Sequence, residues 1–160
     1  LIQQGYMASP DYRPSDSQRP ALKGQRKASD EGFRQLQTPD GLPVLVGRNN
    51  RQNDLLISTV ATDYDLWFHT QEIPGSHVLL RLEAGQVASD RDLAYVADLA
   101  AYFSRARQAD QVPVVYTQPR HVYKPKGARP GMVIYKHETV IWGQPRRIEQ
   151  AQGAQSMELV

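Results

Sequence analysis

The segment from Ser89 to Ser104 has the strongest helical pattern in the chain, and it constrains the fold more than any other feature. Its apolar and small residues lie on one helical stripe: Leu93, Val96, Ala97, Ala100, Ala101 and Ser104. Ser89 with Asp92 three residues later resembles a capping box, which predicts where the helix begins. Because small side chains let a helix approach a sheet closely, we expect one long helix packed against strands.

Runs of apolar residues on both sides of this helix predict the strands. They lie at 33–38, 43–46, 66–69, 77–82 and 112–117, and a closing hairpin is expected at 132–135 and 139–142. A short helix is expected between the second and third strands, with Asn50 or Asn53 as its N-cap. The fold class that follows is α+β: a mixed, largely antiparallel sheet with one long and one short helix.

The two ends of the chain lack such patterns. Residues 1–32 combine prolines, glycines and alternating charges, a composition that cannot bury enough apolar surface to offset its ordering entropy. We therefore expect a disordered tail over 1–32, a domain over 33–148 and a flexible tail over 149–160. Since the sequence begins with Leu1 rather than Met, we also expect it to be a piece of a larger protein.

The composition excludes several function classes. The chain of 160 residues contains no cysteine, which rules out a disulfide scaffold, cysteine-ligated zinc and thiol catalysis. It has no run of about 18 apolar residues, so we expect no membrane span. The glycine-rich signatures of nucleotide-binding loops are also missing, and we expect no cofactor.

Positive charge is concentrated in one segment. Lys and Arg number 19 against 17 Asp and Glu, yet residues 111–137 hold five basic residues and no acidic one. The centre of this segment, 124–131, carries Lys124, Lys126 and Arg129 among prolines and glycines, which predicts a loop. Such cations suit a phosphate backbone, and the interleaved tyrosines suit exposed bases. A solvated surface loop is the alternative interpretation.

Two polar groups precede this loop. Residues 47–54 are rich in amide side chains, which either read base edges or serve as local turn and cap residues. A Pro-Gly turn at 74–75 has four polar residues before and after it in the sequence: Asp65, His69, Ser76 and His77. Their residue types allow a Ser-His-Asp catalytic set or a metal site with two histidines and one carboxylate. Their spacing matches neither a helical zinc motif nor a nucleophile elbow, so we favour structural or ligand-contacting roles over catalysis.

Four motifs occur along the chain in a defined order. They are VGRNN at 46–50 with QND at 52–54, DLWFH at 65–69, PGSHV at 74–78, and KPKG at 124–127 with PGMV at 130–133. Together they resemble the NFACT-R domain, the RNA-binding module of the NFACT or RqcH (fibronectin-binding protein A-like) family of ribosome quality control factors. The resemblance covers about Phe33 to Pro145.

The resemblance implies a function and a set of partners. It implies an RNA-binding module of a cytoplasmic factor that supports mRNA-independent alanine tailing of stalled nascent chains. The implied partners are tRNA, the large ribosomal subunit and other domains of the same full-length protein, with no membrane. Because the ribosome itself makes the peptide bonds, the resemblance implies no enzyme and no catalytic or metal-binding residue.

The resemblance also implies the site residues. The expected nucleic-acid contacts are Arg48, Asn49, Asn50, Asn53, Asp54, His69, Ser76, His77, Lys124, Lys126 and Arg129. Arg48 and the three loop cations are expected to meet phosphate. The asparagines are expected to orient the loop or to meet base and sugar groups. The histidines are expected to hydrogen-bond to the ligand, to Asp54 or to Asp65.

Two alternatives remain open from the sequence. One is a metal-dependent nucleic-acid-processing enzyme built on four residues: Asp54, Asp65, His69 and His77. The other is a protein-docking module without direct RNA contact, for which we expect an exposed apolar patch around Ile141 and Trp142.

Overall fold

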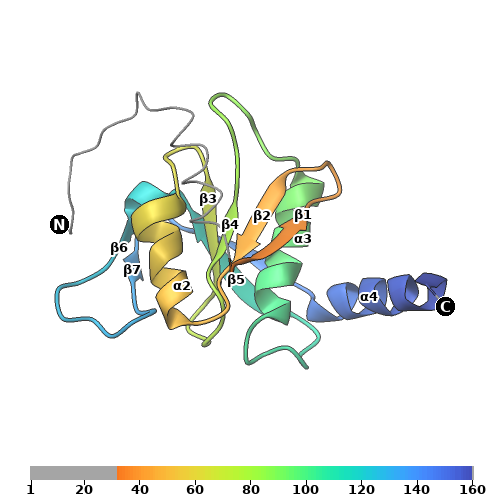
Figure 1. The fold of residues 1–160 in the computed structure, drawn as a ribbon. Helices are drawn as coiled ribbons and strands as arrows, with labels where there is room; N and C mark the ends of the chain where they lie inside the picture. Colours follow the sequence, from red (N-terminus) through yellow and green to blue (C-terminus); the bar gives the residue numbers. More distant parts are fainter. Residues whose placement is uncertain (1–31, 160) are drawn as a thin grey trace.

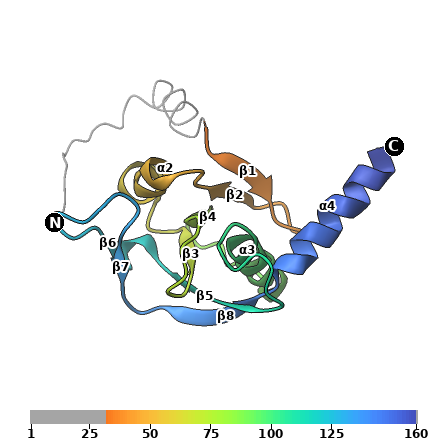
Figure 2. The same ribbon diagram turned by 90° about the horizontal axis from the view of Figure 1, so that it is seen from below.

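Six antiparallel strands form a sheet that curves around one long helix (Figures 1 and 2). The computed structural model of the chain describes residues 32–159. The strands, in their order across the sheet, are β1 (Arg34–Gln37), β2 (Pro43–Val46), β4 (Val78–Leu80), β3 (Leu66–Thr70), β5 (Val112–Thr117) and β8 (Thr139–Gly143). A separate two-stranded ladder joins β6 (Val122–Tyr123) to β7 (Ile134–Tyr135).

Helices cover both faces of the sheet. They are α2 (Asn50–Leu55), which continues as a π-helical turn η1 (Leu56–Val60), then α3 (Asp90–Tyr102), the 3-10 turn η2 (Pro119–His121) and α4 (Pro145–Leu159). Helix α3 lies inside the curve of the sheet, and α2 lies on its outer face (Figure 2). The α+β fold class is confirmed, and the strand pairs among the described residues are antiparallel.

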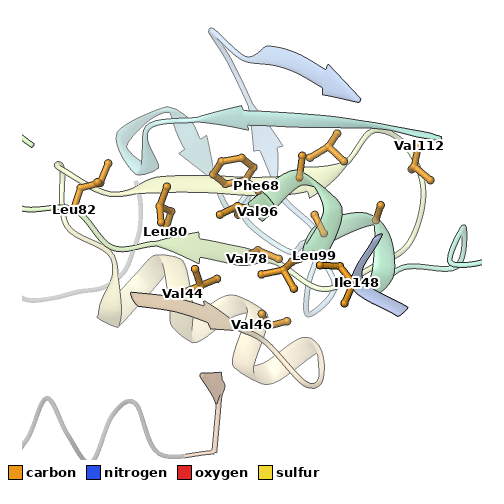
Figure 3. Packing of buried hydrophobic residues seen from close by; sticks show 14 residues of the cluster. Val44, Val46, Phe68, Val78, Leu80, Leu82, Val96, Leu99, Val112 and Ile148 are labelled. Carbon is orange, nitrogen blue, oxygen red and sulfur yellow. The ribbon is translucent and has the colours of Figure 1, made fainter. Parts of the chain in front are cut away.

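Side-chain alternation along the strands produces two cores. Phe68 lies opposite Val78, and both belong to the cluster on the α3 face, together with Val46 and Leu99 (Figure 3). Trp67 and Leu79 point to the other face and pack with the apolar residues of α2 and η1. Because successive side chains of a strand point to opposite faces, two consecutive residues of one strand supply one side chain to each core. The outer core supports the polar site described below.

Helix α3 confirms the small-residue stripe. Ala97, Ala100 and Ala101 are fully buried against the sheet, and the Ser89 hydroxyl accepts a hydrogen bond from the Asp92 amide as the N-cap. The buried Asp92 carboxylate accepts the Thr38 hydroxyl at 2.6 Å. Asp92 therefore ties the start of α3 to the turn between β1 and β2.

The predicted closing hairpin is wrong. Strand β7 pairs with β6, whereas β8 pairs with β5 along the edge of the main sheet. His137 between them has a φ of 56°, and the Thr117 hydroxyl donates to the carbonyls of Lys136 and His137. The chain therefore changes direction at 136–137, which separates β7 from β8 and leads them to different partners.

The C-terminal part contains a helix that the sequence pattern did not predict. Helix α4 begins at Pro145, and Ile148 is buried in the core on the α3 side. The Gln144 amide donates to Asp98 of α3 at 2.7 Å, and Arg147 lies 3.7 Å from the same carboxylate. Of the residues at 145–152, only Pro145 and Ile148 are buried, so the segment has little hydrophobic periodicity from which a helix could be predicted.

The predicted N-terminal tail lies, except for Gly32, outside the described residues, and the domain limits remain predictions. Among the helices described, none combines the length and the apolar character that a membrane crossing requires.

Candidate nucleic-acid interface

The loop 124–131 folds back onto the start of α2 (Figure 1). The Gly131 amide donates to Asp54 Oδ1 at 3.0 Å, and Lys124 Nζ lies 3.3 Å from the same oxygen. Lys124 Nζ also donates to the carbonyls of Arg129 and, at 3.2 Å, Met132. One carboxylate and one ammonium group therefore hold together both ends of the loop.

Glycine at position 131 permits this close approach. Gly131 has a φ of +84°, and a Cβ there would lie 2.5 Å from Asn50 Oδ1. A side chain would be strained by the backbone conformation and would collide with α2. The glycine thus lets the loop backbone reach Asp54.

The start of α2 is built by Asn49 and Gln52. Asn49 Oδ1 accepts the Gln52 amide at 2.9 Å, and Gln52 Oε1 accepts the Arg48 amide at 2.8 Å. Asn49 is therefore the N-cap, and the predicted caps at Asn50 or Asn53 are wrong. The arrangement resembles a capping box, although Gln52 accepts the amide of the residue before the cap. The Asn-x-x-Gln spacing in the sequence was the signal that could have identified it.

Asn53 is buried, in contrast to Asn49, and it makes a contact within the protein. Its side chain is 4% exposed, and Oδ1 accepts the His77 amide at 3.1 Å. A Cβ on Gly47 would lie 2.0 Å from that oxygen, so position 47 requires glycine. Asn53 therefore links α2 to the start of β4.

His77 connects the sheet to the loop. Its ring is buried, Nδ1 accepts the Trp67 indole N–H at 3.2 Å, and Nε2 lies 3.2 Å from the Gly131 carbonyl. Because Nδ1 is an acceptor, the neutral tautomer carries its proton on Nε2 and donates it to Gly131. Burial and, to a smaller extent, the neighbouring His69 lower the pKa of His77 to about 3. His77 therefore stays neutral near pH 7.

His69 and Ser76 lie at the border of this cluster. The His69 ring stacks on Trp67, with 5.8 Å between centroids, and its Nε2 is 3.3 Å from the Gly75 carbonyl. Burial lowers the pKa of His69. Ser76 is half-buried, and its amide donates to the Phe103 carbonyl at 2.9 Å.

Asp65 is separate from this cluster. It is fully buried, its carboxylate accepts the amides of Thr62 and Leu82, and Arg81 Nε lies 3.1 Å from it. Asp65 precedes β3 and His69 stands near its end, so about 13 Å separate them at 3.3 Å per residue. The predicted histidine bonds to Asp54 or Asp65 are replaced by bonds to Trp67, Gly75 and Gly131. Over residues 32–159, no His, Asp and Glu side chains gather in threes around a possible metal position.

The predicted residues form two sets in space. The outer set is exposed and consists of Arg48, Asn49, Asn50, Lys126 and Arg129. Gly131 lies close to Asn50, which places the loop next to the start of α2. The inner set holds the loop in place: Asn53, Asp54, His77 and Lys124. Trp67, Gly131 and Gln52 complete the inner set and were absent from the predicted site.

Three comparisons identify relatives of the chain. A family model described as "NFACT protein RNA binding domain" matches residues 32–137. The Rqc2 homolog RqcH of Bacillus subtilis (strain 168) is 42% identical over 125 residues, which cover 77% of this chain and 21% of the relative. The Rqc2 homolog RqcH of Streptococcus suis (strain 05ZYH33) is 40% identical over 108 residues, covering 68% and 19%. The chain thus spans about a fifth of these relatives' length.

A solved structure agrees with the sequence comparisons. The C-terminal part of the fibronectin/fibrinogen-binding protein from Streptococcus suis is 38% identical to this chain, with a TM-score of 0.66. The match covers 71% of this chain and 45% of the other. The resemblance inferred from the four motifs is confirmed, and the chain belongs to the NFACT-R family of RNA-binding domains.

Proposed function

We propose that this domain binds RNA through the loop 124–131 and the start of α2, as the RNA-binding part of a ribosome quality control factor. The observation that carries the proposal is the anchored loop: it carries exposed Lys126 and Arg129, and its Gly131 lies against Asn50, two residues after exposed Arg48. Cations on a held loop lose little conformational freedom when they bind phosphate. The family description supports the same class of ligand.

The residues of the two sets have different roles. Arg48, Lys126 and Arg129 contact phosphates, while Asn49 and Asn50 beside them meet sugar or base groups. Half-buried His69 and Ser76 offer polar contacts at the border. The four residues of the inner set position the loop: Asn53, Asp54, His77 and Lys124.

The partner within this class is tRNA, large-subunit rRNA or both. Tyr123 next to the loop is 41% exposed, and Lys136 Nζ lies 5.2 Å from its ring centroid, so it offers a face on which an unpaired base stacks. In the whole protein, this contact supports mRNA-independent alanine tailing of stalled nascent chains. The ribosome performs the chemistry, so we assign no catalytic residue to the domain.

A salt series of RNA binding tests the proposal. We expect the chain to bind tRNA, and the double variant Lys126→Gln/Arg129→Gln to flatten the log–log salt dependence by about two units. Arg91→Gln/Arg120→Gln is the control, because neither residue belongs to the loop or to α2: Arg91 lies in the first turn of α3, and Arg120 lies in η2. An unchanged slope in the first variant removes the loop from the interface.

A second candidate function is docking onto another domain of the same full-length protein. Edge strand β8 exposes 48% of Val140 and 57% of Trp142, whereas Ile141 between them packs into the core. This candidate predicts that the chain binds no RNA even at low salt. In that case Val140→Thr/Trp142→Ser weakens its association with the rest of the protein, as measured by pull-down.

A further inference from the structure

Three arginines from two separate segments meet at one end of the sheet. Arg34 starts β1, whereas Arg105 and Arg107 follow α3. The Arg105 amide donates to the Pro74 carbonyl at 2.9 Å, and a β-bridge joins Gly75 to Ser104. The segment after α3 is therefore attached to the turn that precedes β4.

Aromatic rings hold two of these arginines in place. Arg34 Cζ lies 4.7 Å from the centroid of the Phe103 ring, and Arg107 Cζ lies 3.9 Å from that of Tyr102. The two rings are themselves in contact, with 5.0 Å between centroids. A guanidinium stacked on a ring keeps its N–H edge available for a phosphate and loses less freedom on binding.

None of the three is neutralised by a carboxylate in the part of the chain that the structure describes. All three are exposed, and none has an acidic partner within 4.0 Å there. Four other arginines of the same part do have such a partner: Arg81, Arg91, Arg146 and Arg147. The positive charge of an exposed arginine without an acidic partner is not neutralised within the protein, so it attracts a polyanion.

These arginines lie at the same end of the domain as the anchored loop. Arg34 is opposite Val46, two residues before Arg48, and the Gly47 amide donates to the His77 carbonyl. Figure 1 shows the loop 124–131, the start of α2 and the segment after α3 at the lower end of the molecule. The loop lies on the outer face of the sheet with α2, and Arg105 and Arg107 lie on the α3 side.

We propose that Arg34, Arg105 and Arg107 form a second phosphate-binding set, which contacts another part of the backbone of the RNA held by the loop. This inference rests on the proposed function and extends it across the end of the sheet. The sets lie on opposite sides of the sheet, so the RNA that fits both is folded or helical and presents two stretches of backbone.

Three double variants test the second set separately from the loop. We expect Arg105→Gln/Arg107→Gln to weaken tRNA binding by about tenfold or more and to flatten its salt slope by about two units, over salt from about 50 to 200 mM. Arg105→Lys/Arg107→Lys keeps the charge, so its slope stays near that of the parent chain. Arg91→Gln/Arg120→Gln removes two charges elsewhere, and its slope changes by less than about one unit.

The outcomes separate this inference from the proposed function. An unchanged slope for Arg105→Gln/Arg107→Gln, together with a flattened slope for Lys126→Gln/Arg129→Gln, overturns the second set and leaves the loop as the interface. Equal flattening in the Arg91/Arg120 control also overturns it, because the effect is then one of total charge. If neither the loop variant nor the Arg105/Arg107 variant alters binding, the proposed function itself fails. Thermal unfolding of each variant shows that it is folded.

Discussion

At the scale of the residue, a side chain's chemical type fixes what it can do, and its surroundings fix what it does. His77 is able to donate to RNA, but both of its ring nitrogens have partners inside the protein. Asn53 is able to read a base edge, but its carbonyl oxygen binds the His77 amide. Buried polar groups need such partners, because an unsatisfied one costs about 1–3 kcal/mol. These two residues are therefore parts of the scaffold.

The buried neutral His77 makes stability depend on pH. Between about pH 3 and pH 6.5 the unfolded chain binds a proton at this histidine and the folded chain does not, so stability is lost as the pH falls below 6.5. We expect His77 to contribute a fall of about 2 kcal/mol in the free energy of unfolding from about pH 7 to about pH 5. His69, whose pKa is also lowered, adds in the same direction.

Urea titrations at several pH values measure this fall. In His77→Gln the fall becomes smaller by about 2 kcal/mol, because glutamine does not titrate there. An equally steep fall in that variant contradicts the neutral, buried state of His77.

At the scale of the element, the loop 124–131 is held by contacts distant in sequence. Asp54 of α2 and Gly131 are 77 residues apart, and His77 and Gly131 are 54 apart. Gly47 and Gly131 allow these close approaches, since a Cβ at either position collides with an asparagine of α2. The loop, α2 and the start of β4 therefore behave as one unit.

Lys124 and Lys126 differ in role although they are two residues apart. Lys126→Gln removes a phosphate contact and flattens the salt slope of tRNA binding by about one unit. Lys124→Gln breaks the ion pair with Asp54, so we expect it to weaken binding with a smaller change of slope. Asp54→Asn breaks the same ion pair without removing a cation, and it serves as the comparison. Equal flattening by both lysine variants makes Lys124 a phosphate contact too.

At the scale of the whole molecule, six exposed cations that have no acidic partner among residues 32–159 lie at one end of the domain: Arg34, Arg48, Arg105, Arg107, Lys126 and Arg129. The opposite end holds Arg91 in an ion pair with Asp40, next to the Ser89 cap of α3. A polarised domain of this kind orients itself toward a polyanion before contact.

Hydrogen exchange measures the footprint of RNA on this polarised surface. We expect tRNA to protect amides in 47–54, 103–107 and 124–131, and to leave those in 86–92 unchanged, because that segment lies at the far end of α3. Protection confined to β8 instead supports docking through Val140 and Trp142.

Much of the fold could be predicted from local patterns. The limits of β2 and β5 agree with the predicted strands, and Ser89 caps α3 as expected. These features depend on neighbours within a few residues, namely alternation, a cap three residues from its donor, and turn residues. The β7–β8 hairpin was predicted wrongly because sequence adjacency favours pairing, whereas here the chain turns at His137.

The candidate site shows where local information ends. Residue types are enough to identify the chemical groups of the site: the cations of 124–131, the amides of 47–54 and the two histidines. The ion pair of Lys124 with Asp54, the burial of His77 and the position of Arg34 and Arg105 at one end of the sheet follow from the three-dimensional fold. The reason is physical: burial and charge pairing depend on segments far apart in the chain, and folding alone brings those segments together.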